Sequence, residues 1–207
     1  MPDYSNNFWN ERYSSNEYTY GVYPNHFLKE QLEKITHPGK LLLPGEGEGR
    51  NAVYAAKLGW QVDAYDQSTS GRLKALKLAD KNNVKINYHI ADLREFTPLK
   101  NTYDAAAVIY VHLREDLRIE FNEKLIEVLK PGGLIIMELF SKNQFGKNSG
   151  GPQDLAMLYS IDEIKKDFQN LKTIILKEEL IHLNESDKHS GEASVIRFVG
   201  EKILLSL

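Results

Sequence analysis

The stretch PGEGEGR places three glycines at alternate positions directly after a short apolar run. A tight turn needs only one or two glycines, and three of them let the backbone approach a bound ligand closely. The two residues between them, Glu46 and Glu48, are acidic. Carboxylates a few ångströms from a ligand attract a cation and repel an anion. The stretch therefore predicts a ligand-binding turn that suits positive charge.

Another acidic residue follows the next apolar stretch, WQVDAY. Gly47, Gly49 and Ala52 satisfy the spacing G-x-G-x-x-A, and Asp66 stands after them at the distance where nucleotide-binding α/β folds place the acid that binds the ribose hydroxyls. This spacing fits two ligands, a nicotinamide dinucleotide and S-adenosylmethionine. The pattern alone does not separate them.

The charge of the turn favours the second ligand. The pyrophosphate of a dinucleotide would lie against the turn, where Glu46 or Glu48 would repel it. S-adenosylmethionine carries a sulfonium and an ammonium group against one carboxylate, so an acidic turn attracts it. No Lys-Ser or Lys-Thr pair follows the glycines, which excludes a P-loop for a nucleoside triphosphate. A nicotinamide-dependent oxidoreductase of Rossmann type is the alternative.

Further candidates follow later apolar runs. Asp92 comes after INYHI, where it either caps a turn or accepts a hydrogen bond from an exocyclic amine such as that of adenine. His112, with Tyr110 and Arg114 on either side, either acts as a base, binds the methyl acceptor or makes a structural hydrogen bond. His189 is a candidate substrate or lid residue. No spacing of histidines and acids resembles a metal site, so we expect none.

The N-terminal segment is rich in aromatic residues, namely Trp9, Tyr13, Tyr18, Tyr20 and Tyr23. These rings either close over the donor, with a ring face against the sulfonium, or pack an N-terminal helix onto the sheet. Trp9 and Tyr20 are our candidates for substrate or lid contacts.

Short apolar runs alternate with helical patterns along most of the chain. We predict strands at 41–43, 60–65, 86–90, 104–110 and 134–140, and helices at 51–58, at 70–81 and from residue 117 to the stop at PGG, residues 131–133. Strands separated by such helices are typical of the α/β class, with a parallel sheet covered on both faces. Ligands of such sheets bind beyond the carboxyl ends of the strands, which is where the glycine turn lies.

The C-terminal part departs from this alternation. Residues 172–183 and 193–205 are both strand-like, and only the polar stretch NESDKHSGE lies between them. That connection is too short for a crossover helix, so we predict an antiparallel hairpin. Residues 141–160 show no clear element, which is typical of a functional lid or a disordered loop.

Composition narrows the classes of function. A chain of 207 residues with 42% hydrophobic content supplies one domain with a sizeable core. The absence of cysteine excludes disulfides and thiolate metal sites, and a net charge of -3 without a long basic block argues against nucleic-acid binding. Neither a signal-peptide pattern nor a membrane-length apolar run is present. We expect a cytoplasmic protein, a monomer or weak homodimer, with a small-molecule substrate.

Several motifs occur together in an order that resembles a known family. LLLPGEGEG, DQS, ADL, YDAAAVIY and LKPGGLIIMEL, within residues 38–140, resemble the motifs of class I S-adenosylmethionine-dependent methyltransferases. FWNERYSSNEYTYGVYPNHFL, GEGEGRNAVYAAKLGW, the pair His112–Leu113, GGPQDLAML and KHSGEASV resemble the tellurite-resistance-type branch of that family. LKPGG alone is weak evidence, whereas the ordered set is specific.

The resemblance implies a Rossmann-like, doubly wound sheet of seven strands, mostly parallel, with an antiparallel C-terminal hairpin and helices on both faces. It also implies S-adenosylmethionine as cofactor and methyl transfer to a small molecule, such as a metalloid oxyanion or a thiol. One position departs from the pattern. Many members carry an acid where Leu43 stands, so we expect Glu46 or Glu48 to compensate.

On this interpretation residues 1–207 form one methyltransferase domain. Its parts are an N-terminal helical or lid segment (1–37), a donor-binding core (38–140), an acceptor-side loop (141–160) and a C-terminal helix and hairpin (161–207). The expected catalytic side chains are His112, Tyr110 and Arg114. The expected donor-binding residues are Gly45, Glu46, Gly47, Gly49, Asn51, Asp66, Gln67, Asp92, Leu93 and Tyr110.

Overall fold

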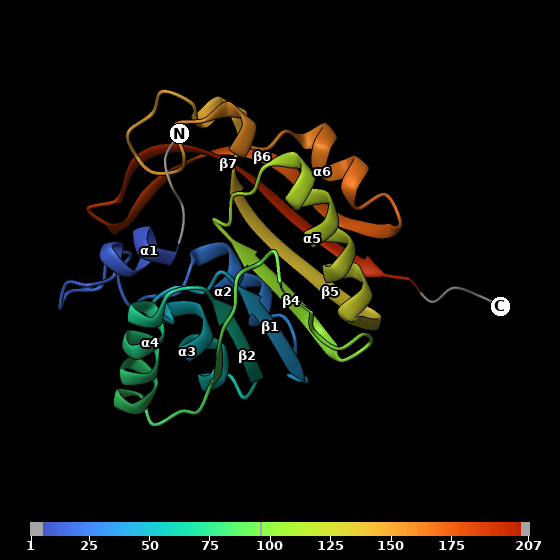
Figure 1. Cartoon of the computed structure of the whole chain (residues 1–207). Coiled ribbons are helices and arrows are strands. Elements are labelled where there is room, and N and C mark those ends of the chain that lie inside the picture. The colour runs from blue at the N-terminus through green and yellow to red at the C-terminus, as the bar shows by residue number, and fades with distance from the viewer. Residues whose placement is uncertain (1–5, 96, 204–207) are drawn as a thin grey trace.

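Seven strands form one sheet in the computed structural model, which describes residues 6–95 and 97–203 (Figure 1). Across the sheet the order is β3-β2-β1-β4-β5-β7-β6, parallel except that β7 runs antiparallel to both of its neighbours. The strands are β1 (Lys40–Pro44), β2 (Gln61–Asp66), β3 (Asn87–Ile90), β4 (Tyr103–Ile109), β5 (Leu129–Phe140), β6 (Leu171–Ser186) and β7 (His189–Lys202). This architecture confirms the predicted mostly parallel, seven-stranded sheet with its C-terminal hairpin.

Helices cover both faces of the sheet (Figure 1). One apolar cluster joins α2, α3 and α4 to the sheet, and another joins α5 and α6 to the opposite face. The helices are α1 (Asn6–Arg12), α2 (His26–Leu32), α3 (Arg50–Lys57), α4 (Thr69–Lys81), α5 (Glu115–Val128) and α6 (Ile161–Asp167). The layers are those of a doubly wound α/β fold.

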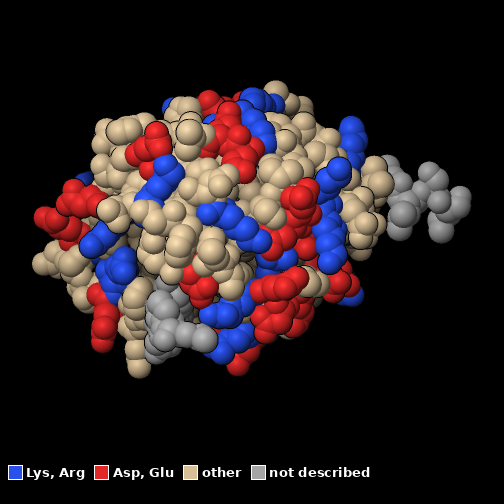
Figure 2. All heavy atoms as spheres, turned by 90° about the horizontal axis from the view of Figure 1, so that it is seen from above, with Lys and Arg blue, Asp and Glu red and all other residues tan. Residues whose placement is uncertain are grey.

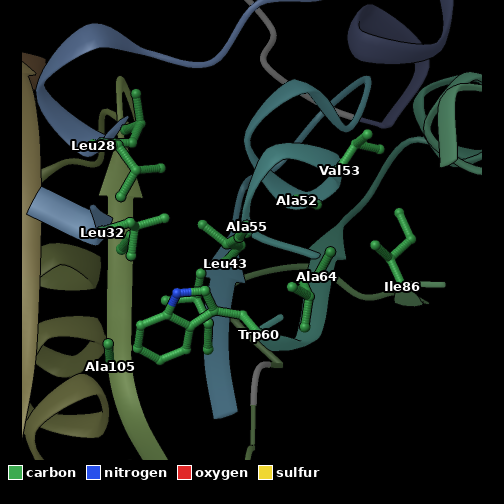
Figure 3. Packing of buried hydrophobic residues seen from close by; sticks show 14 of the residues in the cluster. Leu28, Leu32, Leu43, Ala52, Val53, Ala55, Trp60, Ala64, Ile86 and Ala105 are labelled. Carbon is green, nitrogen blue, oxygen red and sulfur yellow. The ribbon is translucent and has the colours of Figure 1, made fainter. Parts of the chain in front are cut away.

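The side chains of β1 divide between the two faces because strand side chains alternate. Leu41 and Leu43 belong to the cluster beneath α3, and Leu42 belongs to the cluster beneath α5. Figure 3 shows Ala52 and Ala55 of α3 among the side chains of the first cluster, together with Leu43. Such small side chains let α3 lie close to the sheet, and the glycine turn between β1 and α3 is thereby fixed at the carboxyl end of β1.

Two predicted boundaries were wrong at the C-terminal side. The polar stretch 184–192 is mostly strand: β6 continues to Ser186 and β7 begins at His189, so the turn is only Asp187 and Lys188. Backbone hydrogen bonds continue the two strands through this stretch, but its side chains are polar. No alternation of apolar and polar residues therefore indicated a strand there. The predicted strand at 193–205 ends at Lys202, and residues 204–207 lie outside the described residues.

The fifth predicted strand also began too late. Helix α5 ends at Val128, and β5 begins at Leu129 and includes the PGG stretch, residues 131–133. In the predicted loop 141–160 the structure has two short 3-10 helices, η1 (Lys142–Gln144) and η2 (Leu155–Met157).

Charged side chains of both signs are interspersed on the face shown in Figure 2. Within residues 6–95 and 97–203, none of the helices combines the length and the apolar character needed to cross a bilayer.

Candidate functional site

A cavity of about 1130 Å³ lies at the carboxyl ends of the parallel strands. The glycine turn, the ends of β2 and β4, the N-terminal segment, the loop 150–157 and the tip of the β6–β7 hairpin all contribute to its wall. Every predicted site residue except Gly49 lines it: Trp9, Tyr20, Gly45, Glu46, Gly47, Asn51, Asp66, Gln67, Asp92, Leu93, Tyr110, His112, Arg114 and His189. Segments far apart in the sequence therefore share one cavity.

Two glycines of the turn are needed for different reasons. Gly47 has φ +62°, lines the cavity, and donates its N–H to Asp66 Oδ2 at 2.9 Å. Gly49 has φ +89° as the N-cap of α3, and a Cβ there would lie 2.5 Å from the Cβ of Ala75. Gly47 thus shapes the cavity, whereas Gly49 allows α3 and α4 to approach each other.

Two buried carboxylates face the cavity beside this turn. Glu46 accepts the N–H of Ala52 at 2.7 Å, at the start of α3, and Asp66 accepts the N–H groups of Gly47 and Ser68 at 2.9 and 2.8 Å. Burial raises the pKa of Glu46 to about 7 and that of Asp66 to about 6, against the opposing effect of these hydrogen bonds. Both carboxylates are poorly solvated, so a cation bound beside them would be stabilised.

The other glutamate of the turn is engaged elsewhere. Glu48 Oε1 lies 2.6 Å from the Nζ of Lys74, and its Oε2 accepts the N–H of Tyr20 at 3.3 Å. The Glu48 side chain is only 3% exposed. Glu48 therefore links the N-terminal segment to α4, and Glu46 is the acid that remains for a ligand.

Asp92 lies in the turn that follows β3 and also lines the cavity. Its Oδ1 accepts the N–H of Arg94 at 2.9 Å, and its Oδ2 pairs with the Arg94 guanidinium at 2.5 Å. The hydrogen bonds from Arg94 lower the pKa of Asp92. Asp92 stabilises its own turn and also lines the cavity. Capping the turn and accepting a hydrogen bond from a ligand are therefore compatible roles.

His112 is fixed by hydrogen bonds at both ring nitrogens. Its Nδ1 donates to the carbonyl of Met157 at 2.8 Å, and its Nε2 accepts the N–H of Phe140 at 3.4 Å. Burial lowers the pKa of His112 to about 4. A base at this position would first have to give up its bond to Phe140.

Tyr110 adopts φ +55°, a conformation that few residues other than glycine adopt. Its hydroxyl donates to Glu138 Oε1 at 2.6 Å, and its ring stacks on Phe140 with centroids 4.6 Å apart. Glu138 also accepts from Asn25 at 2.6 Å and pairs with Arg197 at 2.6 Å. The sequence reasoning missed this network, although a glutamate inside the apolar run LIIMELF was a signal for it.

The remaining candidates lie at the rim and in the N-terminal segment. Arg114 pairs with Asp154 at 2.8 Å. The ring of Trp9 stacks on that of Tyr13 at 5.5 Å, and the ring of Tyr20 lies 4.6 Å from that of His189. The aromatic segment therefore forms part of the cavity wall.

Comparison with known proteins places the chain in a family. The family model described as "Tellurite resistance protein TehB" matches residues 7–201. This chain belongs to the TehB family. The resemblance noted from the motifs is confirmed by this match.

A curated TehB relative from Haemophilus influenzae, named a probable S-adenosyl-L-methionine-dependent methyltransferase, is 21% identical over 161 residues, 76% of this chain and 54% of the relative. The chain thus spans about half the length of the curated relatives it matches.

Solved structures share the fold of this TehB-family chain. Crystalline TehB from Haemophilus influenzae has a TM-score of 0.73 at 16% identity, covering 95% of this chain and 66% of that one. A structure described with the conversion of a disulfide bond into a thioacetal group during echinomycin biosynthesis has a TM-score of 0.77 at 15% identity, covering 96% and 90%. The structure of phosphoethanolamine N-methyltransferase 2 of Haemonchus contortus in complex with S-adenosylhomocysteine has a TM-score of 0.67 at 15% identity. The match covers 95% of this chain and 57% of that one.

A search of residues 6–95 and 97–203 finds no group of three or more His, Cys, Asp or Glu side chains arranged to hold a metal ion.

Proposed function

We propose that this TehB-family chain is an S-adenosylmethionine-dependent methyltransferase that acts on a small molecule. The observation that carries the proposal is the pair of buried carboxylates, Glu46 and Asp66, beside a glycine turn in a cavity at the carboxyl ends of the strands. A sulfonium donor with an ammonium group suits these carboxylates, and a pyrophosphate does not. The residues present therefore fit the cofactor that the curated relative's name specifies.

The donor-binding residues have separate tasks in this proposal. Glu46 takes the role of the acid missing at Leu43, which is buried in the core, and binds the methionine end together with the turn backbone. Asp66 binds the ribose, and Asp92 binds the adenine amine. The remaining donor residues are Gly45, Gly47, Asn51, Gln67, Leu93 and Tyr110. The donor supplies an activated methyl group, so the protein has to position the acceptor and exclude water.

For the acceptor we propose a metalloid oxyanion or a thiol. The N-terminal segment, through Trp9 and Tyr20, and the loop 141–160 act as the lid over it, since both contribute to the cavity wall. The alternative, a nicotinamide-dependent oxidoreductase, is opposed by the same buried carboxylates that favour a cationic donor.

Calorimetric titration of the purified protein with S-adenosylmethionine, S-adenosylhomocysteine and NADH tests this function. We expect both adenosyl ligands to bind and NADH to give no heat of binding. Binding of NADH without a response to the other two would overturn the proposal in favour of the oxidoreductase.

Asp66→Asn is expected to weaken S-adenosylmethionine binding by about 1–3 kcal/mol, because a charged acceptor of ribose hydrogen bonds is lost. Gly47 and Ser68 donate to different oxygens of Asp66, so the single oxygen of asparagine keeps one of these two hydrogen bonds. Calorimetry gives the affinity, and Asp63→Asn, on the same strand but outside the cavity lining, is the control. Equal affinities of wild type and Asp66→Asn would show that another residue binds the ribose.

The raised pKa values of Glu46 and Asp66 predict opposite pH trends for stability and donor binding. A carboxylic acid in the unfolded chain has a pKa of about 4. The folded chain retains protons on Glu46 to about pH 7 and on Asp66 to about pH 6. Stability of the donor-free protein therefore falls as pH rises from about 4 to about 7. Affinity for the cationic donor rises through pH 6–7, because ionised carboxylates bind it better.

Thermal unfolding across this range measures the first trend. Calorimetry in buffers with different ionisation enthalpies measures the second as protons released on binding. Glu46→Gln is expected to remove most of both trends near pH 7. Donor binding near pH 6–7 without proton release in the wild type would contradict this explanation.

A further inference from the structure

The tip of the β6–β7 hairpin places an imidazole beside a carboxylate at the cavity wall. His189 is the first residue of β7 and pairs with Ser186, the last residue of β6, across the two-residue turn. Glu185 precedes Ser186, at the register shift of the ladder. His189 Nδ1 lies 3.0 Å from Glu185 Oε2. Because a carboxylate only accepts hydrogen bonds, Nδ1 carries the proton, and the lone pair of the neutral ring is on Nε2.

The carboxylate of this pair is itself held in place. Arg50 Nη2 lies 3.0 Å from Glu185 Oε2, and Arg50 Nη1 donates to the carbonyl of Tyr20 at 3.1 Å. Burial acts to raise the pKa of Glu185, but the hydrogen bond from His189 and the charge of Arg50 keep that pKa below its usual value. Glu185 is therefore an ionised partner that orients the imidazole.

Nε2 is the ring nitrogen of His189 that Glu185 does not contact. His189 lines the cavity, and within the part of the chain that the structure describes no hydrogen bond to Nε2 is present. Gly150 lies beside the His189 ring. A Cβ added at Gly150 would lie 2.8 Å from Cδ2 and 3.2 Å from Nε2 of His189. His112, by contrast, uses both of its nitrogens. His189 is thus the cavity histidine with an available acceptor nitrogen.

The surroundings of His189 indicate what kind of acceptor fits. Its ring contacts those of Tyr20, Tyr110 and Phe140, with centroids 4.6, 4.8 and 5.6 Å away. The titratable or charged groups around it are Glu185 from β6, Lys188 from the hairpin turn, Arg50 from α3, Tyr20 from the segment before α2, Tyr110 after β4, and His112 before α5. The charge of Arg50 is paired with that of Glu185.

Two further cations of the cavity are paired, Arg94 with Asp92 and Arg114 with Asp154. Arg12 and Lys188 also line the cavity, and Arg12 donates to the hydroxyl of Tyr20 and lies over the ring of Phe8. The rings that contact His189 suit an uncharged, polarisable nucleophile. Such a nucleophile has to lose a proton, and an oxyanion does not.

We propose that the acceptor is a neutral thiol and that His189, oriented by Glu185, is the base that takes its proton. This inference rests on the proposed methyltransferase function. The thiol proton passes to Nε2, the thiol sulfur forms a bond to the methyl carbon, and the electron pair of the broken carbon–sulfonium bond stays with the departing sulfur. The products are a methyl thioether, S-adenosylhomocysteine and one proton, which leaves His189 for solvent.

His189→Gln tests the base. We expect kcat for an alkyl thiol to fall about 10²–10⁴-fold at neutral pH, with unchanged affinity for S-adenosylhomocysteine. For an acidic aromatic thiol, already ionised at that pH, the loss should nearly disappear. The control is His182→Gln, because His182 is an exposed residue of the same hairpin. An equal loss for both kinds of thiol would show that His189 has only a structural role.

Glu185→Gln tests the positioning residue. In Glu185→Gln the rate with an alkyl thiol should fall while the rate with an acidic aromatic thiol changes little, so the alkyl-to-aromatic rate ratio falls. An unchanged ratio would remove Glu185 from the proposal.

A measurement on the unaltered protein gives a readout without turnover. With S-adenosylhomocysteine bound, an alkyl thiol should show thiolate absorbance that is absent in His189→Gln. Absence of thiolate in wild type would overturn the assignment even if the variants misfold. Methylation of selenite or tellurite but of no thiol would overturn the thiol class. If the wild-type protein does not bind S-adenosylmethionine at all, the proposed methyltransferase function fails, and this outcome is distinguishable from failure of the thiol proposal.

Discussion

Replacing Glu138 with alanine is expected to lower the free energy of unfolding by about 3–5 kcal/mol, because the substitution leaves buried partners uncompensated. The Glu138 side chain is 1% exposed, and its carboxylate accepts hydrogen bonds from Arg197, Asn25 and Tyr110, each at 2.6 Å. In the alanine variant the guanidinium of Arg197 keeps Glu179 as its carboxylate partner. The amide of Asn25 and the hydroxyl of Tyr110 lose Glu138 as their acceptor. The low-dielectric surroundings make each loss costly.

Urea unfolding monitored by circular dichroism measures this change. The matched control is Glu179→Ala, which removes the other carboxylate on Arg197 but at a 31% exposed side chain, so we expect a cost of about 0–1 kcal/mol. Glu138→Gln should lie between the two, since the amide oxygen still accepts from one partner. Similar costs for Glu138→Ala and Glu179→Ala would show that the buried network contributes no more than a surface pair.

Gly49→Ala is expected to cost about 2–5 kcal/mol, the sum of two effects. The left-handed conformation at φ +89° costs a residue with a Cβ about 1–2 kcal/mol. The new Cβ would also lie 2.5 Å from Cβ and 2.7 Å from Cα of Ala75, and separating α3 from α4 adds about 1–3 kcal/mol. Since α3 begins at this residue, donor binding at the turn should weaken as well.

A second glycine isolates the packing contribution. Gly132 has φ +80°, but a Cβ there meets no atom within 4 Å, so Gly132→Ala should show the conformational cost alone. Adding Ala75→Gly to Gly49→Ala should restore part of the lost stability, and a double-mutant cycle measures that coupling. Equal costs for Gly49→Ala and Gly132→Ala, with no coupling to residue 75, would falsify the close-approach explanation.

The meeting of the glycine turn, Asp66 and Asp92 at one cavity, on the proposed donor side, could be predicted from sequence because its evidence is local. The glycine turn, Asp66 and Asp92 each follow a strand within one continuous stretch, and strand ends meet at one edge of a parallel sheet. The sequence could not show that Glu48 is paired with Lys74 whereas Glu46 is not, because both glutamates have glycines as neighbours in the chain.

The acceptor side could not be predicted in the same way, because its residues meet only through tertiary structure. Phe140, Tyr20 and His189 come from three distant segments. The contact of Glu185 with His189 depends on a hairpin turn placed at residues 187 and 188, and the polar stretch 184–192 carries no apolar alternation to locate that turn. His112 was the more visible histidine because it directly follows a buried strand.

The position of β7 in the sheet has a consequence for the order of folding. This strand follows β6 in the chain but lies between β5 and β6, with hydrogen bonds to both. During synthesis β6 therefore emerges before the strand that joins it to the sheet, and it has no partner until β7 arrives. The half of the cavity around the glycine turn can form co-translationally, while the hairpin half waits for long-range pairing, which is slow. On the proposed function, a nascent chain is expected to bind the donor before it can select an acceptor.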